Sequence, residues 1–196
     1  DAVPELGNRL LINGDLFDFW FAYRRSIPRA GIRVLSRLGE LARRIPVAMT
    51  GGNHDRWGGL FWQEELGIEF SGDRLRLPFG ARTALAIHGD GVGEANWRGA
   101  MMHRITRHPA AVTLFRLLHP DLGIWMVNHM SGYLADSTRQ AEILDRAAER
   151  QRGWAEQHLR ADPGVALLVM GHTHRPVAAE LLPGQWYANP GARLDG

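Results

Sequence analysis

The chain has 196 residues, of which 45% are hydrophobic and 22% charged, enough apolar material for a buried core. There is no cysteine, which excludes disulfide scaffolds, zinc–cysteine sites and cysteine nucleophiles. The net charge is +2 and all 23 basic residues are arginine, so Schiff-base lysines and a Walker-type phosphate loop are excluded. No run reaches the ~18 apolar residues of a membrane span, and Asp1–Pro4 do not resemble a signal peptide. We therefore expect a cytoplasmic protein.

Short apolar runs predict buried strands along most of the chain. They end at clusters of glycine and polar residues and cover residues 10–12, 47–49, 84–87 and 165–170. A helix is expected over residues 32–45, because its apolar residues share one face and Pro46 stops it. Alternation around Leu75 and Leu77 predicts a half-exposed strand, and residues 177–188 predict a closing hairpin.

Residues 94–160 differ in kind, because they show no strand pattern. We expect three or four helices there, the last running from about Asp136 or Ser137 to about Leu159, as an insert on an α/β fold. Between Glu94 and Ala135 the only acidic residues are Glu94 and Asp121, while arginine, histidine, tryptophan and phenylalanine are interleaved. That composition is typical of a surface that contacts anionic membranes, although such residues also pack inside a protein or against a second subunit.

Ligand-type side chains follow each of the four predicted buried strands. The candidates are Asp15, Asn53, His88, His172 and His174. Because open α/β sheets place their sites beyond the carboxyl ends of strands, we expect these residues to form a metal site. Nitrogen and oxygen donors suit Mn, Fe, Zn, Co or Ni. If residues 172–174 are extended, the two imidazoles lie on one side, and two ions about 3.5–4 Å apart become possible.

Four motifs resemble those of calcineurin-like metallophosphoesterases and occur in the order of that family. They are Gly14-Asp15-Leu16-Phe17-Asp18, Gly52-Asn53-His54-Asp55, His88-Gly89-Asp90 and Gly171-His172-Thr173-His174, with Asn189-Pro190-Gly191 as a further similar turn. The resemblance implies a β-sandwich flanked by helices, with residues 1–196 as a single domain and residues 94–160 as its helical cap. It also implies a centre of two divalent metals, with Mn expected first.

The resemblance assigns roles to individual residues. Asp15 would bridge the two metals. The coordination of one ion would be completed by Asn53, His88 and His172, and the other ion would be bound by His174. His54 would lie near the leaving group, oriented by Asp55. The Asp-x-His motif that opens the family is not found before Leu10, so we expect these residues to be a fragment lacking the first strand.

A closer resemblance is to UDP-2,3-diacylglucosamine pyrophosphatases of lipid A synthesis, which release UMP and a lipid monophosphate. It rests on residues 14–20, on His88-Gly89-Asp90 followed by a helical insert, and on residues 171–176. The best-known branch carries arginine in place of His54. The resemblance implies a peripheral position on the cytoplasmic face of the inner membrane.

Other interpretations stay open. Asn96 and Arg139 are candidate substrate contacts, chosen only by their position in the insert. The expected substrate is a phosphorylated small molecule or lipid nucleotide, without nucleic acid as a partner, and the oligomeric state is not predicted. A general phosphodiesterase of the same superfamily is one alternative. A non-catalytic scaffold is another, favoured by the missing Asp-x-His motif and opposed by the retained Asn53 and His172.

Overall fold

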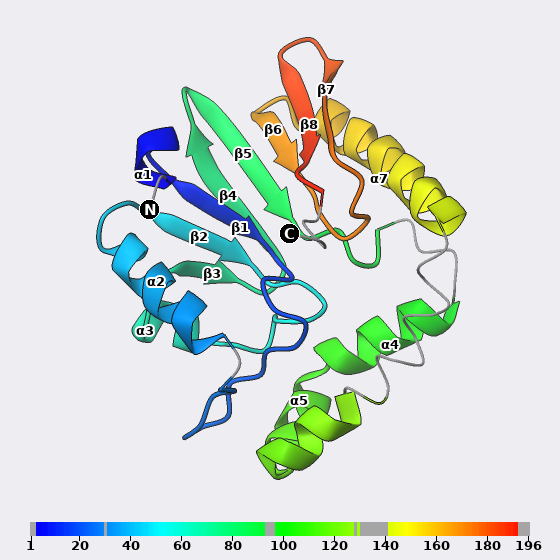
Figure 1. The fold of residues 1–196 in the computed structure, drawn as a ribbon. Coiled ribbons are helices and arrows are strands. Elements are labelled where there is room, and N and C mark those ends of the chain that lie inside the picture. Colours follow the sequence, from blue (N-terminus) through cyan, green and yellow to red (C-terminus); the bar gives the residue numbers. More distant parts are fainter. Residues whose placement is uncertain (1–2, 30, 93–96, 128, 130–140, 192–196) are drawn as a thin grey trace. The chain divides into compact units, whose positions relative to one another are not determined.

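The computed structural model describes residues 3–29, 31–92, 97–127, 129 and 141–191. The chain divides into two compact units, Asp1–Leu75 and Arg76–Gly196. Each unit contains one sheet and its own buried core, and the two are described in turn (Figure 1). The assignment of all 196 residues to a single domain stays a prediction.

The first unit contains a three-stranded parallel sheet. Its strands are β1 (Leu10–Asn13), β2 (Val47–Thr50) and β3 (Glu69–Ser71), in the order β1-β2-β3, and its helices are α1 (Val3–Leu6), α2 (Ile32–Ala42) and α3 (Phe61–Glu64). Asn13 pairs in register with Thr50. The carboxyl ends of β1 and β2 therefore lie side by side, and the loops that follow them start from the same edge of the sheet.

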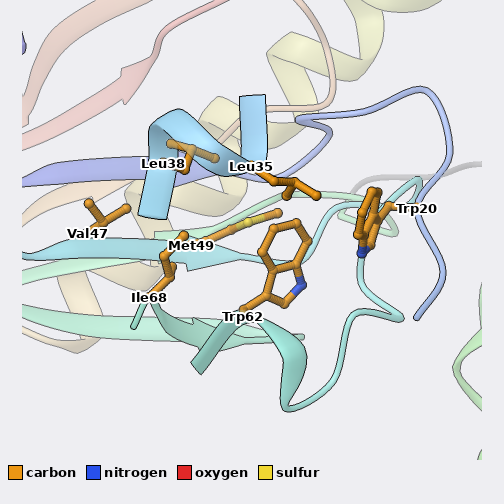
Figure 2. Close-up of a cluster of buried hydrophobic side chains, with 7 residues drawn as sticks. All are labelled: Trp20, Leu35, Leu38, Val47, Met49, Trp62 and Ile68. Carbon is orange, nitrogen blue, oxygen red and sulfur yellow. The ribbon is translucent and has the colours of Figure 1, made fainter. Parts of the chain in front are cut away.

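Helix α2 covers this sheet with one apolar face, as its sequence predicts. Leu35 and Leu38, one turn apart, pack with Val47 and Met49 of β2 (Figure 2). The cluster is completed by Trp20, Trp62 and Ile68, and the Trp20 ring stacks on Phe17 at a centroid distance of 4.9 Å. The Trp20 amide donates a hydrogen bond of 2.8 Å to the His54 carbonyl, which ties this core to the loop after β2.

The second unit contains a five-stranded mixed sheet. Its strands are β4 (Arg74–Phe79), which begins at the boundary between the units, β5 (Arg82–Ile87), β6 (Val165–Val169), β7 (Val177–Leu182) and β8 (Gln185–Asn189). The order is β4-β5-β6-β8-β7, with β5, β6 and β8 parallel and β7 antiparallel to β8. The half-exposed strand at Leu75 and Leu77 and the closing hairpin are both confirmed.

The connection between β5 and β6 holds the helical insert. It contains α4 (Trp97–Arg107), α5 (Pro109–Arg116), further helical residues at 120–127, and α7 (Ala141–Ala161), with no strand among its described residues. The predicted helical character is confirmed there. The predicted start of the last helix lies outside the described residues, and its end is Ala161 rather than Leu159. None of the described helices combines the length and apolarity that a membrane span needs.

Helix α7 supplies one side of the core of the second unit. Ala155 and Leu159 pack with Leu85, Leu168 and Tyr187 of the sheet. Figure 1 shows this helix, in yellow, alongside β6 and β8. Gln151 continues the same face one turn earlier and is completely buried, although it is polar.

Candidate metal centre

Asp15 lies in the loop after β1 and has a left-handed backbone. Its φ is 53°, and the preceding Gly14 also has a positive φ of 78°. A non-glycine residue rarely adopts this conformation unless its surroundings impose it. The Asp15 carboxylate accepts a hydrogen bond of 3.0 Å from the His54 amide, and a side chain on Gly52 would overlap that carboxylate. The loops after β1 and β2 are thus fitted to one another around Asp15.

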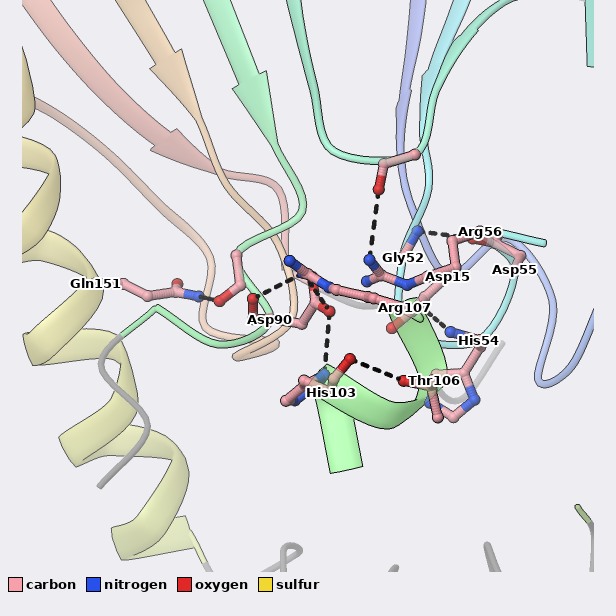
Figure 3. Close-up of polar contacts among 12 residues, drawn as sticks. Asp15, Gly52, His54, Asp55, Arg56, Asp90, His103, Thr106, Arg107 and Gln151 are labelled. Carbon is pink, nitrogen blue, oxygen red and sulfur yellow. Dashed lines mark hydrogen bonds and ion pairs between the residues drawn. The ribbon is translucent and has the colours of Figure 1, made fainter. Parts of the chain in front are cut away.

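Asp55 joins the same two loops through their backbones. It is fully buried and accepts a hydrogen bond of 2.8 Å from the Gly52 amide (Figure 3). It also accepts a hydrogen bond of 2.6 Å from the Leu16 amide. Charge-assisted bonds of this kind are stronger than neutral ones, so Asp55 stabilises the loop that carries Asn53. Asn53 is half-buried in that loop.

The His54 ring is held by a backbone carbonyl. Its Nδ1 lies 2.6 Å from the Asp18 carbonyl oxygen. Since a carbonyl only accepts, Nδ1 carries the proton and Nε2 is the atom left to exchange one. The resemblance implies that Asp55 orients this ring, but the contact that holds the ring comes from Asp18, through its backbone rather than its carboxylate.

His88 and His172 lie together in the second unit. His88 follows β5 and is buried, and the two rings meet edge to face at a centroid distance of 5.4 Å. The loops are also joined by a bond of 2.8 Å from the Gly171 amide to the His88 carbonyl. Because β5 and β6 are parallel neighbours, their carboxyl ends bring these two residues to one edge.

The backbone at His172 and His174 differs from the expectation. The φ angles are 67° and 56°, so the segment is not extended, and the condition for placing both rings on one side of a strand is not met. The strand β6 ends at Val169, before the motif, which forms a tight loop in which the Thr173 amide donates to the Gly171 carbonyl at 2.7 Å. Three of the five expected ligands therefore have left-handed backbones.

Asp90 receives two basic side chains of α4. Its buried carboxylate lies 2.9 Å from Arg107 Nη2 and 3.3 Å from His103 Nδ1 (Figure 3). Neither partner was identified from the sequence, where both residues counted only as part of a basic insert. The polar residues Gln151 and Asn189, which contact the ligand-bearing loops, had no assigned role either. The candidate substrate contacts Asn96 and Arg139 lie outside the described residues.

The geometry and the donor types together fit a metal-dependent hydrolase. Each unit presents oxygen or imidazole donors from loops that follow the carboxyl ends of parallel strands, and three of these donors, Asp15, His172 and His174, have left-handed backbones. Such donors suit divalent transition metals.

Comparison with known proteins identifies the family. The family model for calcineurin-like phosphoesterases matches residues 2–176, and the chain belongs to that family. The expected α/β metallophosphoesterase fold and the expectation of a phosphoesterase enzyme are therefore confirmed.

Several relatives share a more specific description. A UDP-2,3-diacylglucosamine hydrolase of Porphyromonas gingivalis is 28% identical over 82% of this chain and 67% of its own length. One of Vibrio cholerae is 24% identical over 91% of this chain and 77% of its own. Among solved structures, phosphopantetheinyl hydrolase of Mycobacterium tuberculosis is 14% identical, with 92% and 77% of the two chains covered and a TM-score of 0.42. Vps29 of Entamoeba histolytica is 17% identical, with 94% and 73% covered and a TM-score of 0.36.

Proposed function

We propose that this phosphoesterase hydrolyses the pyrophosphate of a lipid nucleotide, as a UDP-2,3-diacylglucosamine hydrolase does, releasing UMP and a lipid monophosphate. The observation that carries the lipid part of the proposal is the apolar surface of the insert. Among the described residues of the insert, the exposed large apolar ones are Met101, Ile105, Leu114, Leu117, Leu122, Trp125 and Ile143. The relatives named as such hydrolases also support it.

The exposed apolar residues of the insert suit acyl chains. Leu117 is 78% exposed and Leu114 66%, far more than expected for helices that pack into a core. No residue of α5 is buried, and both Phe115 in this helix and Leu118 just beyond it are half-buried. The same helices carry Arg104 and Arg116, whose positive charges can bind phosphate groups or an anionic membrane surface.

The expected metal ligands are Asp15, Asn53, His88, His172 and His174, and we assign them to two divalent ions, with Mn²⁺ as the first choice. Their donor types fit such ions, and the family implies divalent metals. When bound, such ions supply Lewis acidity toward the phosphoryl oxygens and lower the pKa of a water nucleophile.

His54 is the proposed general acid. With Nδ1 donating to the Asp18 carbonyl, the protonated ring donates from Nε2 to the oxygen of the leaving phosphate. Asp55 acts on His54 indirectly, because its hydrogen bonds to the Leu16 and Gly52 amides hold the loop on which His54 lies.

The test combines metal content with two substrates. The chain is purified with Mn²⁺, bound metal is counted, and hydrolysis of UDP-2,3-diacylglucosamine is compared with that of bis-p-nitrophenyl phosphate. We expect two metals and turnover of the lipid nucleotide. Turnover of the diester alone would favour the alternative, a general phosphodiesterase. Metal-free, inactive chains would favour a scaffold.

The role of His54 is tested by substitution. His54→Ala is expected to lower kcat by roughly 10²–10⁴-fold while the metal content stays unchanged. His54→Arg, which introduces the residue of the best-known branch, should retain more activity than the alanine variant because it keeps a cation for the developing charge. A parallel loss of metal and activity in His54→Ala would contradict this role.

A further inference from the structure

Gln151 is a buried polar residue of α7 that contacts both histidine-bearing loops of the second unit. It lies on the apolar face that also carries Ala155 and Leu159, and it is completely buried. A polar side chain in such a position costs free energy unless its atoms are paired. The contacts of its amide group show where that pairing is made.

The nitrogen of the Gln151 amide reaches the loop that follows β5. Nε2 donates a hydrogen bond of 3.2 Å to the carbonyl of Gly89, the residue next to His88 (Figure 3). Gly89 has a positive φ of 101°, and a side chain there would overlap Gln151 Nε2. Gln151 thus occupies the space beside this turn, and the absence of a Cβ at position 89 allows the close approach.

The oxygen of the same amide reaches the loop that follows β6. Oε1 accepts from the hydroxyl of Thr173, at 3.3 Å, and Thr173 is the buried residue between His172 and His174. The Tyr187 hydroxyl lies 3.5 Å from the same oxygen. Burial raises the pKa of Tyr187, so its hydroxyl stays protonated and able to donate.

Asn189 completes this network from β8. Its Nδ2 donates to the Thr173 hydroxyl and to the Gly171 carbonyl, both at 3.0 Å. Its Oδ1 accepts from the Gly191 amide at 2.9 Å. The loop with His172 and His174 is therefore held from two sides, by Asn189 and by Gln151, whereas Gln151 also holds the loop with His88.

From these contacts we propose that Gln151 is a positioning residue, which fixes the spacing of His88 relative to His172 and His174 for metal binding. The inference rests on the metal ligands proposed above. The buried Gln151 side chain forms hydrogen bonds with two loops that follow different strands, β5 and β6. The two histidine loops then keep one separation, as a metal with short, directional bonds to imidazole needs.

The test is the dissociation constant for Mn²⁺, measured by electron paramagnetic resonance, together with the unfolding temperature. Gln151→Met keeps the volume and removes both hydrogen-bonding arms. Gln151 bonds to residues next to the ligands and not to the ligands themselves, yet it holds the loops that carry them. We therefore expect the dissociation constant to rise by about 10-fold or more, as when groups that orient metal ligands are removed. Gln151→Glu can still accept from Thr173 but cannot donate to the Gly89 carbonyl when ionised, so its affinity should also fall.

Gln185→Met is the matched control. Among the described residues of this unit, Gln185 is the other buried glutamine. Its Nε2 donates to the carbonyls of Leu159 at 2.9 Å, Asp162 at 3.1 Å and Val165 at 2.7 Å. None of these three partners adjoins a histidine of the site. We expect this variant to have a lower unfolding temperature than the wild type. Its Mn²⁺ affinity should stay within about twofold of the wild-type value, which is clearly smaller than the 10-fold loss expected for Gln151→Met.

The outcomes separate this inference from the proposed function. If the wild type binds Mn²⁺ and both Gln151 variants bind it equally well, the positioning role is wrong while the metal site stands. If affinity falls in Gln185→Met as much as in Gln151→Met, the effect is general destabilisation and the inference is again wrong. If the wild type does not bind Mn²⁺, the metal assignment fails, and the positioning role of Gln151, which rests on it, fails with it.

Discussion

At the scale of single residues, the most informative feature is the left-handed backbone of Asp15, His172 and His174. Each such residue costs on the order of 1–2 kcal/mol relative to ordinary backbone, and the cost must be met by surrounding contacts. For Asp15 those contacts are the His54 amide and the close approach of Gly52. Strain that is concentrated at expected ligands is consistent with a site whose geometry is set before any ion binds.

Gly52→Ala tests the fit around Asp15. The new methyl group would overlap the Asp15 carboxylate, so we expect the variant to lose roughly 1–3 kcal/mol of unfolding free energy and part of its Mn²⁺ affinity. Urea denaturation and a metal titration measure the two effects. Gly153→Ala is the control, because position 153 is an exposed site within α7 with open space for a methyl group, and it should stabilise by up to ~1 kcal/mol. Equal metal affinity in Gly52→Ala and wild type would contradict the proposed contact.

At the scale of elements, α4 is attached to the loop after β5 by charge. Asp90 is buried, whereas Arg107 is partly exposed, so the pair is shielded from water on one side only. His103, one turn earlier on α4, approaches the same carboxylate. The helix that begins the insert is therefore anchored two residues from His88.

Arg107→Ala is expected to loosen this attachment. Removal of the guanidinium leaves the buried Asp90 carboxylate with a weaker set of partners, at a cost of about 1–3 kcal/mol. Chemical denaturation measures the loss, and limited proteolysis should show faster cleavage within α4. Arg104→Ala, at an exposed arginine of the same helix, should change neither result. Equal cleavage of the two variants would show that Arg107 does not anchor the helix.

Local sequence patterns predict the helices and strands better than they predict the contacts between them. The sequence predicts the buried strand at residues 165–169 and the amphipathic helix that begins at Ile32. Both are predictable because burial produces a regular pattern of apolar residues in the sequence. The candidate ligands follow from their position after those strands. The left-handed loop at His172, the pairing of Arg107 with Asp90 and the role of Gln151 were not predictable, because each depends on residues that are distant in sequence. Gln151 did leave one signal, a polar residue in register with Ala155 and Leu159.

At the scale of the whole chain, the five expected ligands are divided between the two compact units. Asp15 and Asn53 belong to the first, and His88, His172 and His174 to the second. A ligand that binds only the folded chain stabilises it by mass action. Metal binding should therefore be visible in the stability of the protein as well as in its activity.

We expect Mn²⁺ to raise the unfolding free energy by ~2.7 kcal/mol at a free concentration 100 times its dissociation constant, since the gain follows RT ln(1 + [L]/Kd). Thermal unfolding at a series of Mn²⁺ concentrations measures this, and EDTA should reverse it. The double variant His88→Ala/His172→Ala should lose most of the increase. An undiminished increase in that variant would show that the ion binds elsewhere.

The adjacency of β5 and β6 also has a consequence for biosynthesis. These neighbouring strands are separated in sequence by residues 88–164, which include the whole insert. On the ribosome, His88 therefore emerges long before the strand that places His172 beside it, and non-local pairing of this kind is slow to form. The nascent chain must carry an unpaired β5 edge during that interval, and the histidine pair is assembled only after α7 and β6 have been translated.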